Sequence, residues 1–381
     1  MKVLILTCHT GEGHNSTAAA VQDVLDAHGT PCDCADTLAF LSPFVSRVVC
    51  HAHARIYRYM PKAFSAGYRA AEEKPEAFER RSLLYWLLTR GAKKLHDHVK
   101  SGGYDTIICT HAFSSVLATG LLEKFPECKV YTAFVATDYT CSPSVKESRL
   151  DVYFIPDEAI RPDFVSKGIP TERIFPVGLP VRAPFLSSLP REVAAAECSL
   201  DPSRRHLLMM CGSMGCGPLE KLTALLADQL PDDVDLTVVC GTNKPLERKL
   251  SRRFADKSSV RILGFVTGIS ALMDCSDLYL TKPGGISVTE ATAKTLPMVL
   301  VNAVAGCEQY NLQYCLDYGM AQTADKPEEL CALCVSLLQD ENALAQMRAA
   351  ITEHAHNDAA ERIYAFVEEA VQTQAVQVKG E

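Results

Sequence analysis

The chain has 381 residues, 48% hydrophobic and 22% charged, which excludes disordered, collagenous and coiled-coil proteins and favours two domains. Its net charge of −8 argues against a general nucleic-acid binder, because such a protein needs a concentrated basic face. No apolar run approaches the roughly 20 residues that span a bilayer. The first residues also lack the long apolar core and cleavage site of a signal peptide.

Sixteen cysteines in a chain without a predicted export signal indicate reduced thiols. Cys331 and Cys334 form a C-x-x-C inside a run that has the pattern of a helix face. Such a pair either packs in a core or serves metal or redox chemistry. The absence of a second pair at zinc spacing favours core packing.

Short apolar runs alternate with helix-forming stretches through the whole first half. This pattern is typical of a parallel sheet covered by helices on both faces. A glycine-rich loop follows the first run, and a helix is predicted from about Ser16. The predicted strands of the first half are 3–7, 106–109, 130–135 and 152–155.

A stretch at 174–185 contains three prolines and a glycine, which predicts a hinge. The alternation then resumes, and residues 342–374 have a helical pattern without proline. The predicted strands of the second half are 207–211, 234–240, 260–263, 278–281 and 298–301.

We therefore predict an α/β fold with two Rossmann-like, doubly wound parallel-sheet domains facing across a cleft. The first predicted domain is 1–178, and the second is 179–350. A C-terminal helix within 351–381 packs back on the first domain. Ligands of open parallel sheets bind beyond the carboxyl ends of the strands, so this organisation favours an enzyme acting on a small molecule.

The first loop, at 7–14, joins a strand to a helix and is a candidate phosphate or acceptor loop. Gly11 and Gly13 allow close backbone approach, and a helix N-terminus favours an anion. Because Ser16 replaces the third glycine of G-x-G-x-x-G, a dinucleotide site is disfavoured. His14 is either a general base, neutral beside the positive end of the helix dipole, or a capping residue without chemistry.

The second loop has the sequence TKPGGISVTE at 281–290 and also opens a predicted helix. Gly284, Gly285 and Ser287 can present N–H groups and a hydroxyl to a diphosphate. Glu290 follows one turn later on the same helix face, where a carboxylate can accept both hydroxyls of a ribose. The alternative is an ordinary glycine turn followed by a surface glutamate.

The third cluster follows the next predicted strand. Glu308, Gln309 and Asn311 supply acceptors and amides, which suit sugar hydroxyls. By itself this cluster is equally a helix N-terminus with polar caps. Its place one strand after the diphosphate loop favours sugar binding.

Taken together, GEGH at 11–14, TKPGGISVTE at 281–290 and GCEQYN at 306–311 resemble the monogalactosyldiacylglycerol synthase and processive diacylglycerol glucosyltransferase group of glycosyltransferase family 28. The resemblance extends over nearly the whole chain. It implies a GT-B fold and inversion at the anomeric carbon, with a UDP-hexose bound by the C-terminal half and the acceptor by the N-terminal half. It also implies that the reaction needs no metal or other cofactor.

The resemblance assigns roles to individual positions. His14 matches an essential histidine, and Asp138 orients either the acceptor or the base. Gly212 and Ser213 line the donor site, while Phe265 and Val266 meet uracil through backbone groups. The diphosphate is assigned to Gly284, Gly285 and Ser287, the ribose to Glu290, and the hexose to Glu308, Gln309 and Asn311.

Three positions depart from the family pattern. Ser142 and Val145 stand where a histidine near a tryptophan is usual, and Cys307 stands where glutamine is usual. These departures leave the donor hexose and the acceptor open. The diphosphate and ribose positions are intact.

The segment 44–94 differs from the rest of this acidic chain, with eleven Lys and Arg against four Glu. Basic residues with interleaved aromatics suit an anionic membrane surface. The alternative is a pair of helices packed on the sheet with a solvated basic face. The predicted membrane or acceptor residues are Tyr57, Tyr59, Arg80, Arg81 and Trp86.

We therefore predict a cytoplasmic enzyme, peripheral to the inner face of the membrane, that moves a hexose from a UDP-sugar to a lipid such as diacylglycerol. Its predicted partners are the UDP-sugar, the lipid acceptor and an anionic membrane surface, without nucleic acid. The alternatives are a glycosyltransferase with a non-lipid acceptor, a UDP-sugar 2-epimerase and a non-catalytic nucleotide-sugar sensor.

Overall fold

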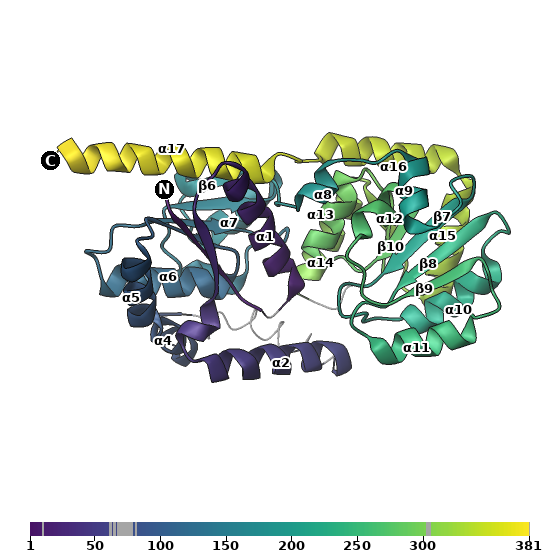
Figure 1. The fold of residues 1–381 in the computed structure, drawn as a ribbon, viewed down its shortest axis with the longest axis horizontal. Coiled ribbons are helices and arrows are strands. Elements are labelled where there is room, and N and C mark those ends of the chain that lie inside the picture. Colours follow the sequence, from purple (N-terminus) through teal and green to yellow (C-terminus); the bar gives the residue numbers. More distant parts are fainter. Residues whose placement is uncertain are drawn as a thin grey trace. The chain divides into compact units, whose positions relative to one another are not determined.

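The computed structural model describes residues 1–9, 11–60, 63, 66, 79–80, 82–301 and 306–380. The chain divides into two compact units (Figure 1). The first comprises Met1–Arg182, 305–307 and His356–Glu381, and the second comprises Ala183–Val304 and Glu308–Ala355. The divisions at 182/183 and 355/356 lie four and five residues beyond the predicted boundaries.

The first unit contains a parallel six-stranded sheet in the order β2-β1-β3-β4-β5-β6. Its strands are β1 (Val3–Thr7), β2 (Cys32–Asp36), β3 (Thr106–Cys109), β4 (Tyr131–Val135), β5 (Val152–Ile155) and β6 (Ile174–Pro176).

Helices cover both faces of this sheet. On one face, α1 (Glu12–Ala27) and α17 (Ala359–Gly380) share a core with the strands. The other face is covered by η1 (Thr37–Phe40), α4 (Leu83–Thr89), α5 (Ala92–Gly102) and α6 (Ala112–Lys124). The remaining elements of this unit are α2 (Pro43–Tyr59), η3 (Pro143–Glu147), η4 (Glu158–Ile160), α7 (Arg161–Ser166) and η5 (Thr171–Arg173).

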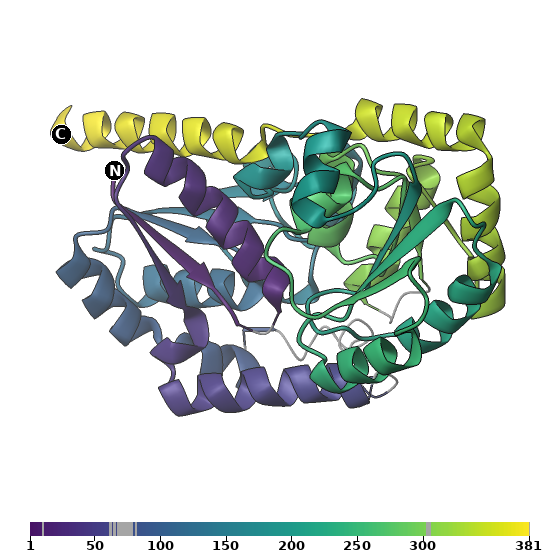
Figure 2. The ribbon, with the colours of Figure 1, turned by 45° about the vertical axis from the view of Figure 1, so that its right-hand side comes forward.

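The C-terminal helix belongs to the first unit. Ile363 and Val367 of α17 are fully buried in the core that α1 shares with the sheet, and the two helices lie side by side (Figure 2). His28 Nε2 lies 2.9 Å from Glu361 Oε2. The helical pattern predicted at 342–374 is confirmed as two helices, α16, which ends at His354, and α17, which starts at Ala359. Asn357 and Asp358, both turn-forming residues, lie in the break.

The second unit has a parallel sheet in the order β12-β11-β10-β7-β8-β9. Its strands are β7 (Arg205–Met210), β8 (Val234–Val239), β9 (Val260–Leu263), β10 (Leu278–Thr281), β11 (Met298–Leu300) and β12 (Ala321–Thr323). The helices in one core with this sheet are α10 (Leu219–Gln229), α11 (Lys244–Arg253), α15 (Pro327–Gln339) and α16 (Glu341–His354). The others are α8 (Ala183–Leu186), α9 (Arg191–Cys198), α12 (Ile269–Asp274), α13 (Gly285–Ala293) and α14 (Cys307–Asp317).

The two Rossmann-like units confirm the predicted fold class. Cys331 and Cys334 of α15 are fully buried among apolar side chains, so core packing is confirmed. Within the described ranges, no helix combines the length and the apolarity needed to cross a bilayer.

Candidate active site

The register of each sheet places the predicted phosphate, donor and base residues together at the carboxyl ends of its strands. In the first unit, Leu6 pairs with Cys109 and Cys109 with Phe134, so the loops after β1, β3 and β4 emerge together. In the second unit, Thr281 pairs with both Met210 and Leu300. The strand order reverses between β1 and β3 and between β7 and β10, which are the switch points where parallel sheets bind ligands.

His14 lies in the first turn of α1, because this helix begins at Glu12 rather than near Ser16 as predicted. Its Nδ1 is 2.9 Å from the carbonyl oxygen of Thr110. A carbonyl only accepts, so this contact assigns the proton to Nδ1 and leaves the lone pair of the neutral ring on Nε2. Burial lowers the pKa of His14, against the opposing effects of Asp138 and the Thr110 carbonyl, and this favours the neutral ring.

Asp138 is connected to His14 through a hydroxyl. Thr137 Oγ1 lies 3.1 Å from His14 Nδ1 and donates to Asp138 Oδ2 over 3.3 Å. Asp163 of α7 holds the same loop, accepting from Thr140 Oγ1 over 2.9 Å. The Thr137 hydroxyl thus connects the His14 ring with the Asp138 carboxyl, which also acts on the ring electrostatically.

His111 is a second imidazole in this site that the sequence reasoning missed. Its ring lies edge-to-face with His14, with 4.4 Å between ring centroids. As the N-cap of α6, its Nδ1 accepts from the backbone N–H of Phe113 over 2.9 Å, so the proton of the neutral ring is on Nε2. The two rings therefore have opposite tautomers. The available signal was a histidine two residues after a predicted strand.

Gly11 is the N-cap of α1, and Gly13 lies in its first turn. The backbone of Gly11 is extended, and among the described residues beyond its chain neighbours no heavy atom lies within 4 Å of the position that a Cβ would occupy. The protein's own packing therefore does not require glycine here. Since glycine has no capping side chain, the first-turn N–H groups are left to other acceptors.

The loop after β10 is organised in the same way. Gly284 is the N-cap of α13, and Gly285 and Ser287 lie in its first turn. No side chain caps this helix among the described residues. The first-turn N–H groups and the Ser287 hydroxyl thus lie at the positive end of a helix dipole, which suits an anion.

Glu290 follows on α13 with its side chain half-buried. Burial raises the pKa of its carboxyl to about 8. No hydrogen bond or ion pair joins this carboxyl to a described residue. The group is therefore largely protonated at pH 7 and available to a polar ligand.

The loop after β7 packs directly on the loop after β10. Gly212 has φ +69°, and a Cβ there would lie 2.7 Å from Lys282 Cε. The positive φ favours glycine at this position, and a larger side chain would also have to displace the end of Lys282. The carbonyl of the neighbouring Ser213 accepts from the backbone N–H of Thr242 over 2.8 Å, which ties the loop to the end of β8.

The three residues predicted to bind the hexose, Glu308, Gln309 and Asn311, lie in different environments. Glu308 is buried, and its Oε1 lies 2.5 Å from Lys282 Nζ. Asn311 is fully buried, and its Nδ2 donates to the Pro283 carbonyl over 3.0 Å, so this amide holds the diphosphate loop. Gln309 is exposed. Lys282 was missed as a site residue although it belongs to the quoted motif.

Two further predicted positions lie on loops. Phe265, between β9 and α12, is 60% exposed, and Val266 is partly buried. Their contact with uracil stays a prediction. Val145, one of the family departures, is fully buried in η3 and packs the core, and Ser142 Oγ lies 3.2 Å from Ser144 Oγ.

The predicted membrane residues are only partly described. Arg81 and the side chains of Tyr57 and Tyr59 lie outside the described residues. Arg80 forms ion pairs with Glu123 and Glu147, and its contact with lipid stays a prediction. Trp86 is 53% exposed, with the Arg90 guanidinium 4.8 Å from its ring centroid.

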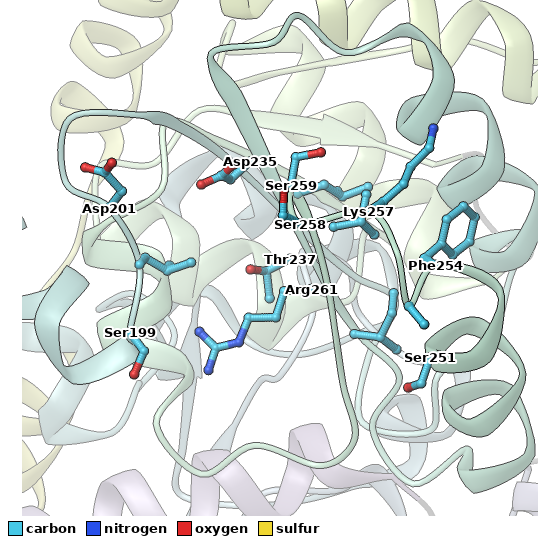
Figure 3. A pocket seen from close by; sticks show the side chains of 15 residues that line it. Ser199, Asp201, Asp235, Thr237, Ser251, Phe254, Lys257, Ser258, Ser259 and Arg261 are labelled. Carbon is cyan, nitrogen blue, oxygen red and sulfur yellow. The ribbon is translucent and has the colours of Figure 1, made fainter.

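A separate pocket of about 430 Å³ opens in the second unit near the amino ends of β8 and β9 (Figure 3). Asp201, Asp235, Lys257 and Arg261 are among its lining residues. It contains none of the predicted donor residues, which follow the carboxyl ends of β7, β9, β10 and β11.

Solved structures with the same fold define the class of protein. The crystal structure of MurG from Acinetobacter baumannii matches with a TM-score of 0.66 at 15% identity, covering 97% of this chain and 99% of that one. A putative UDP-N-acetylglucosamine 2-epimerase from Listeria monocytogenes matches with a TM-score of 0.64 at 13% identity, covering 98% and 97%. The fold is thus the GT-B type, which transferases and epimerases share.

Sequence comparison distinguishes between the transferases and the epimerases that share this fold. Residues 14–181 match the family model of monogalactosyldiacylglycerol (MGDG) synthase, and residues 206–363 match the glycosyltransferase family 28 C-terminal domain. The processive diacylglycerol beta-glucosyltransferase of Staphylococcus carnosus is 28% identical over 351 residues, covering 91% of this chain and 87% of the relative. The chain therefore belongs to the group of glycosyltransferase family 28 that contains MGDG synthases and processive diacylglycerol glucosyltransferases.

Proposed function

We propose that this protein is an inverting hexosyltransferase that moves a hexose from a UDP-sugar to the hydroxyl of a diacylglycerol-type lipid. The observation that carries the proposal is the tautomer of His14. A neutral imidazole with its proton held on Nδ1 by Thr110 presents Nε2 as a base, on the first turn of the helix at the switch point. The activity of the diacylglycerol glucosyltransferases that the chain resembles supplies the substrate classes.

In the proposed reaction, the acceptor oxygen attacks the anomeric carbon while the bond to the UDP oxygen breaks. His14 Nε2 takes the hydroxyl proton, and the electron pair of the broken bond leaves with UDP. The positive charge that forms on the imidazole is stabilised by Asp138, which reaches the ring through Thr137. A single displacement of this kind inverts the anomeric centre.

The donor is held by the second unit in this proposal. The N-terminus of α13 binds the diphosphate and stabilises the charge that develops on it. Glu290 accepts the ribose hydroxyls, and Glu308 and Gln309 face the hexose. Asn311 shapes the loop through Pro283. These groups supply the electrostatic stabilisation without a metal ion.

We also propose that the first unit docks on an anionic membrane, at the inner face of the cytoplasmic membrane. Phe44, Val48, Ile56 and Met60 recur at multiples of four residues along α2 and its C-cap, and all are exposed, Phe44 at 68%. Exposed basic residues run beside them on the same helix, at Arg47 and Arg55. An apolar stripe flanked by cations suits the boundary between acyl chains and anionic headgroups.

The second apolar patch in this unit is on α4. Leu83, Trp86 and Leu87 are exposed there, with Arg90 stacked on Trp86. Tryptophan at a membrane surface places its apolar body toward lipid and its N–H toward water. This patch gives the membrane proposal a second support on the first unit.

The test of the function is UDP release from a panel of UDP-hexoses, with and without diacylglycerol vesicles, in the presence of EDTA. We expect release that requires both one particular UDP-hexose and the lipid, and that EDTA does not abolish. Conversion of a UDP-sugar without lipid would instead favour the epimerase, and binding without turnover would favour the sensor. A soluble sugar or alcohol that replaces the lipid would overturn the lipid acceptor.

A further inference from the structure

Lys282 is the first residue after β10, at the switch point of the second sheet. Its Nζ lies 2.5 Å from Glu308 Oε1. The Glu308 side chain is 8% exposed and that of Lys282 22%, so the pair is largely removed from solvent. Screening by water and salt is weak in such a place, and a nearby anion would interact strongly with this ammonium.

The packing around Lys282 places its ammonium beside the predicted diphosphate residues. A Cβ on Gly212 would lie 3.7 Å from Lys282 Nζ, so the side chain crosses directly over this glycine. A Cβ on Gly284 would lie 3.8 Å from Lys282 Nζ and 3.8 Å from Ser287 Oγ. Three positions assigned to the donor from sequence therefore surround one cation that the assignment omitted.

Before a donor binds, the Lys282 ammonium forms an ion pair with the Glu308 carboxylate. The helix dipole of α13 contributes only about half a positive charge at its N-terminus. A diphosphate carries negative charge on both phosphates and gains more as the sugar leaves. An ammonium already desolvated and pinned at the site stabilises that charge without reorganisation during the reaction.

We infer that Lys282 is a catalytic residue whose ammonium contacts the diphosphate of the donor and stabilises the leaving UDP. The bond between the anomeric carbon and the UDP oxygen breaks, its electron pair stays on that oxygen, and the ammonium remains protonated while it donates to the diphosphate. Glu308 is its counter-ion before the donor binds and a hydrogen-bond acceptor for the hexose afterwards. This inference rests on the proposed function and extends it by naming the leaving-group cation.

The test compares UDP with uridine, which lacks the phosphates, by titration calorimetry. We expect Lys282→Met to weaken UDP binding about 10- to 100-fold, the range of a lost charge-assisted hydrogen bond, and to change uridine binding less than twofold. Because K282M alone removes the cation that pairs with the buried Glu308 carboxylate, the double variant K282M/E308Q is measured as well. It should fold stably and show the same selective loss for UDP.

A matched control is available in the same unit. Lys294 and Asp274 form a buried ion pair at 2.8 Å, near the other end of α13. K294M/D274N should change stability and leave the ratio of UDP to uridine affinity unchanged. Equal losses for UDP and uridine in the Lys282 variants, or no loss for UDP, would overturn the assignment of Lys282. Failure of the wild-type protein to bind UDP would overturn the proposed function and this inference together.

Discussion

The proposed base is defined by one hydrogen bond. His14 Nδ1 meets a carbonyl that can only accept, and burial keeps the ring neutral. The neighbouring His111 uses its Nδ1 as an acceptor at the start of α6, so protonation there would remove a helix cap. His14 is therefore the ring of this pair that can take up a proton without loss of a structural contact.

Replacement of this base should separate chemistry from donor binding. We expect His14→Ala to lower kcat about 100- to 10,000-fold, the usual contribution of a general base, and to leave UDP affinity within about twofold. Turnover rates and calorimetric UDP binding measure the two effects. Near-wild-type kcat would refute the base assignment, and thermal unfolding checks that the variant remains folded.

From the raised pKa of Glu290 we predict that the affinity for UDP depends on pH. Its carboxyl has a pKa raised to about 8, and ribose hydroxyls bind best to the ionised form, so UDP binding at pH 7 should release close to one proton. The affinity for UDP should accordingly fall as the pH drops below 8, by up to about tenfold per pH unit. Calorimetry in buffers of different ionisation enthalpy measures the released proton.

The variant Glu290→Gln is the control for this effect. It should bind UDP more weakly and release no proton. A carboxyl with a raised pKa destabilises the folded state progressively as the pH rises from 4.5 through 8, so E290Q should be more stable than wild type at pH 8 and equally stable near pH 4. Proton release that persists in E290Q would assign the linkage to another group.

At the scale of elements, four described helices start at glycines without a side-chain cap, whereas others start at capping side chains such as His111 of α6. The four glycines are Gly11 of α1, Gly91 of α5, Gly268 of α12 and Gly284 of α13. Of these helices, α1 and α13 directly follow a strand at a switch point. We therefore expect the first-turn N–H groups of α1 and α13 to bind ligand anions.

We predict that reversing the charge of two arginines on the amphipathic helix α2 weakens binding to membranes. Arg47→Glu with Arg55→Glu should reduce binding to anionic vesicles at least tenfold, because each basic residue contributes about 1 kcal/mol near an anionic surface. Co-sedimentation measures the bound fraction. Trp86, the sole tryptophan of the chain, should show a blue-shifted emission on binding.

A matched pair of charge reversals tests whether position matters. Arg248 and Arg252 are exposed on α11 of the second unit, and R248E/R252E makes the same change in net charge. This variant should bind vesicles like the wild type. Equal losses in both double variants, or binding that is indifferent to anionic lipid, would refute docking through α2.

The strands missed from sequence share a physical feature. β2, β6 and β12 are all sheet edges and have polar or half-buried residues, whereas the central strands are continuous apolar runs. Central parallel strands are buried on both faces, so they can be recognised as apolar runs, whereas these three edge strands cannot. The fourth edge strand, β9, was predicted because its sequence, VRIL, is largely apolar. Likewise, the early start of α1 at Glu12 was hidden because glycine is a poor helix former.

At the scale of the whole molecule, the first unit contains both the beginning of the chain and its last helix. After the second unit ends, α17 returns to bury Ile363 and Val367 against the first sheet. The stability of the first unit therefore depends on the last segment of the chain.

Shortening a buried side chain of α17 should lower the stability of the first unit only. We expect Ile363→Ala to destabilise the first unit by about 2–5 kcal/mol, the cost of a large-to-small change in a core. The second unit should keep its UDP affinity, and UDP at 100 times its Kd should stabilise it by about 2.7 kcal/mol. Calorimetric unfolding with and without UDP measures both effects. A loss of UDP affinity in I363A would show that the two units do not behave independently.

The fold class and the positions of the three loop motifs followed from the sequence by itself. Buried parallel strands are local apolar runs, and glycine-rich turns before helices are local as well, so both are visible without tertiary contacts. The tertiary structure decided the chemistry of individual groups. The tautomer of His14 depends on Thr110, 96 residues away, the partner of Arg80 is Glu123, and Lys282 meets Glu308 across 26 residues. Such contacts depend on which loops the sheet register brings together, and no local pattern encodes that distance.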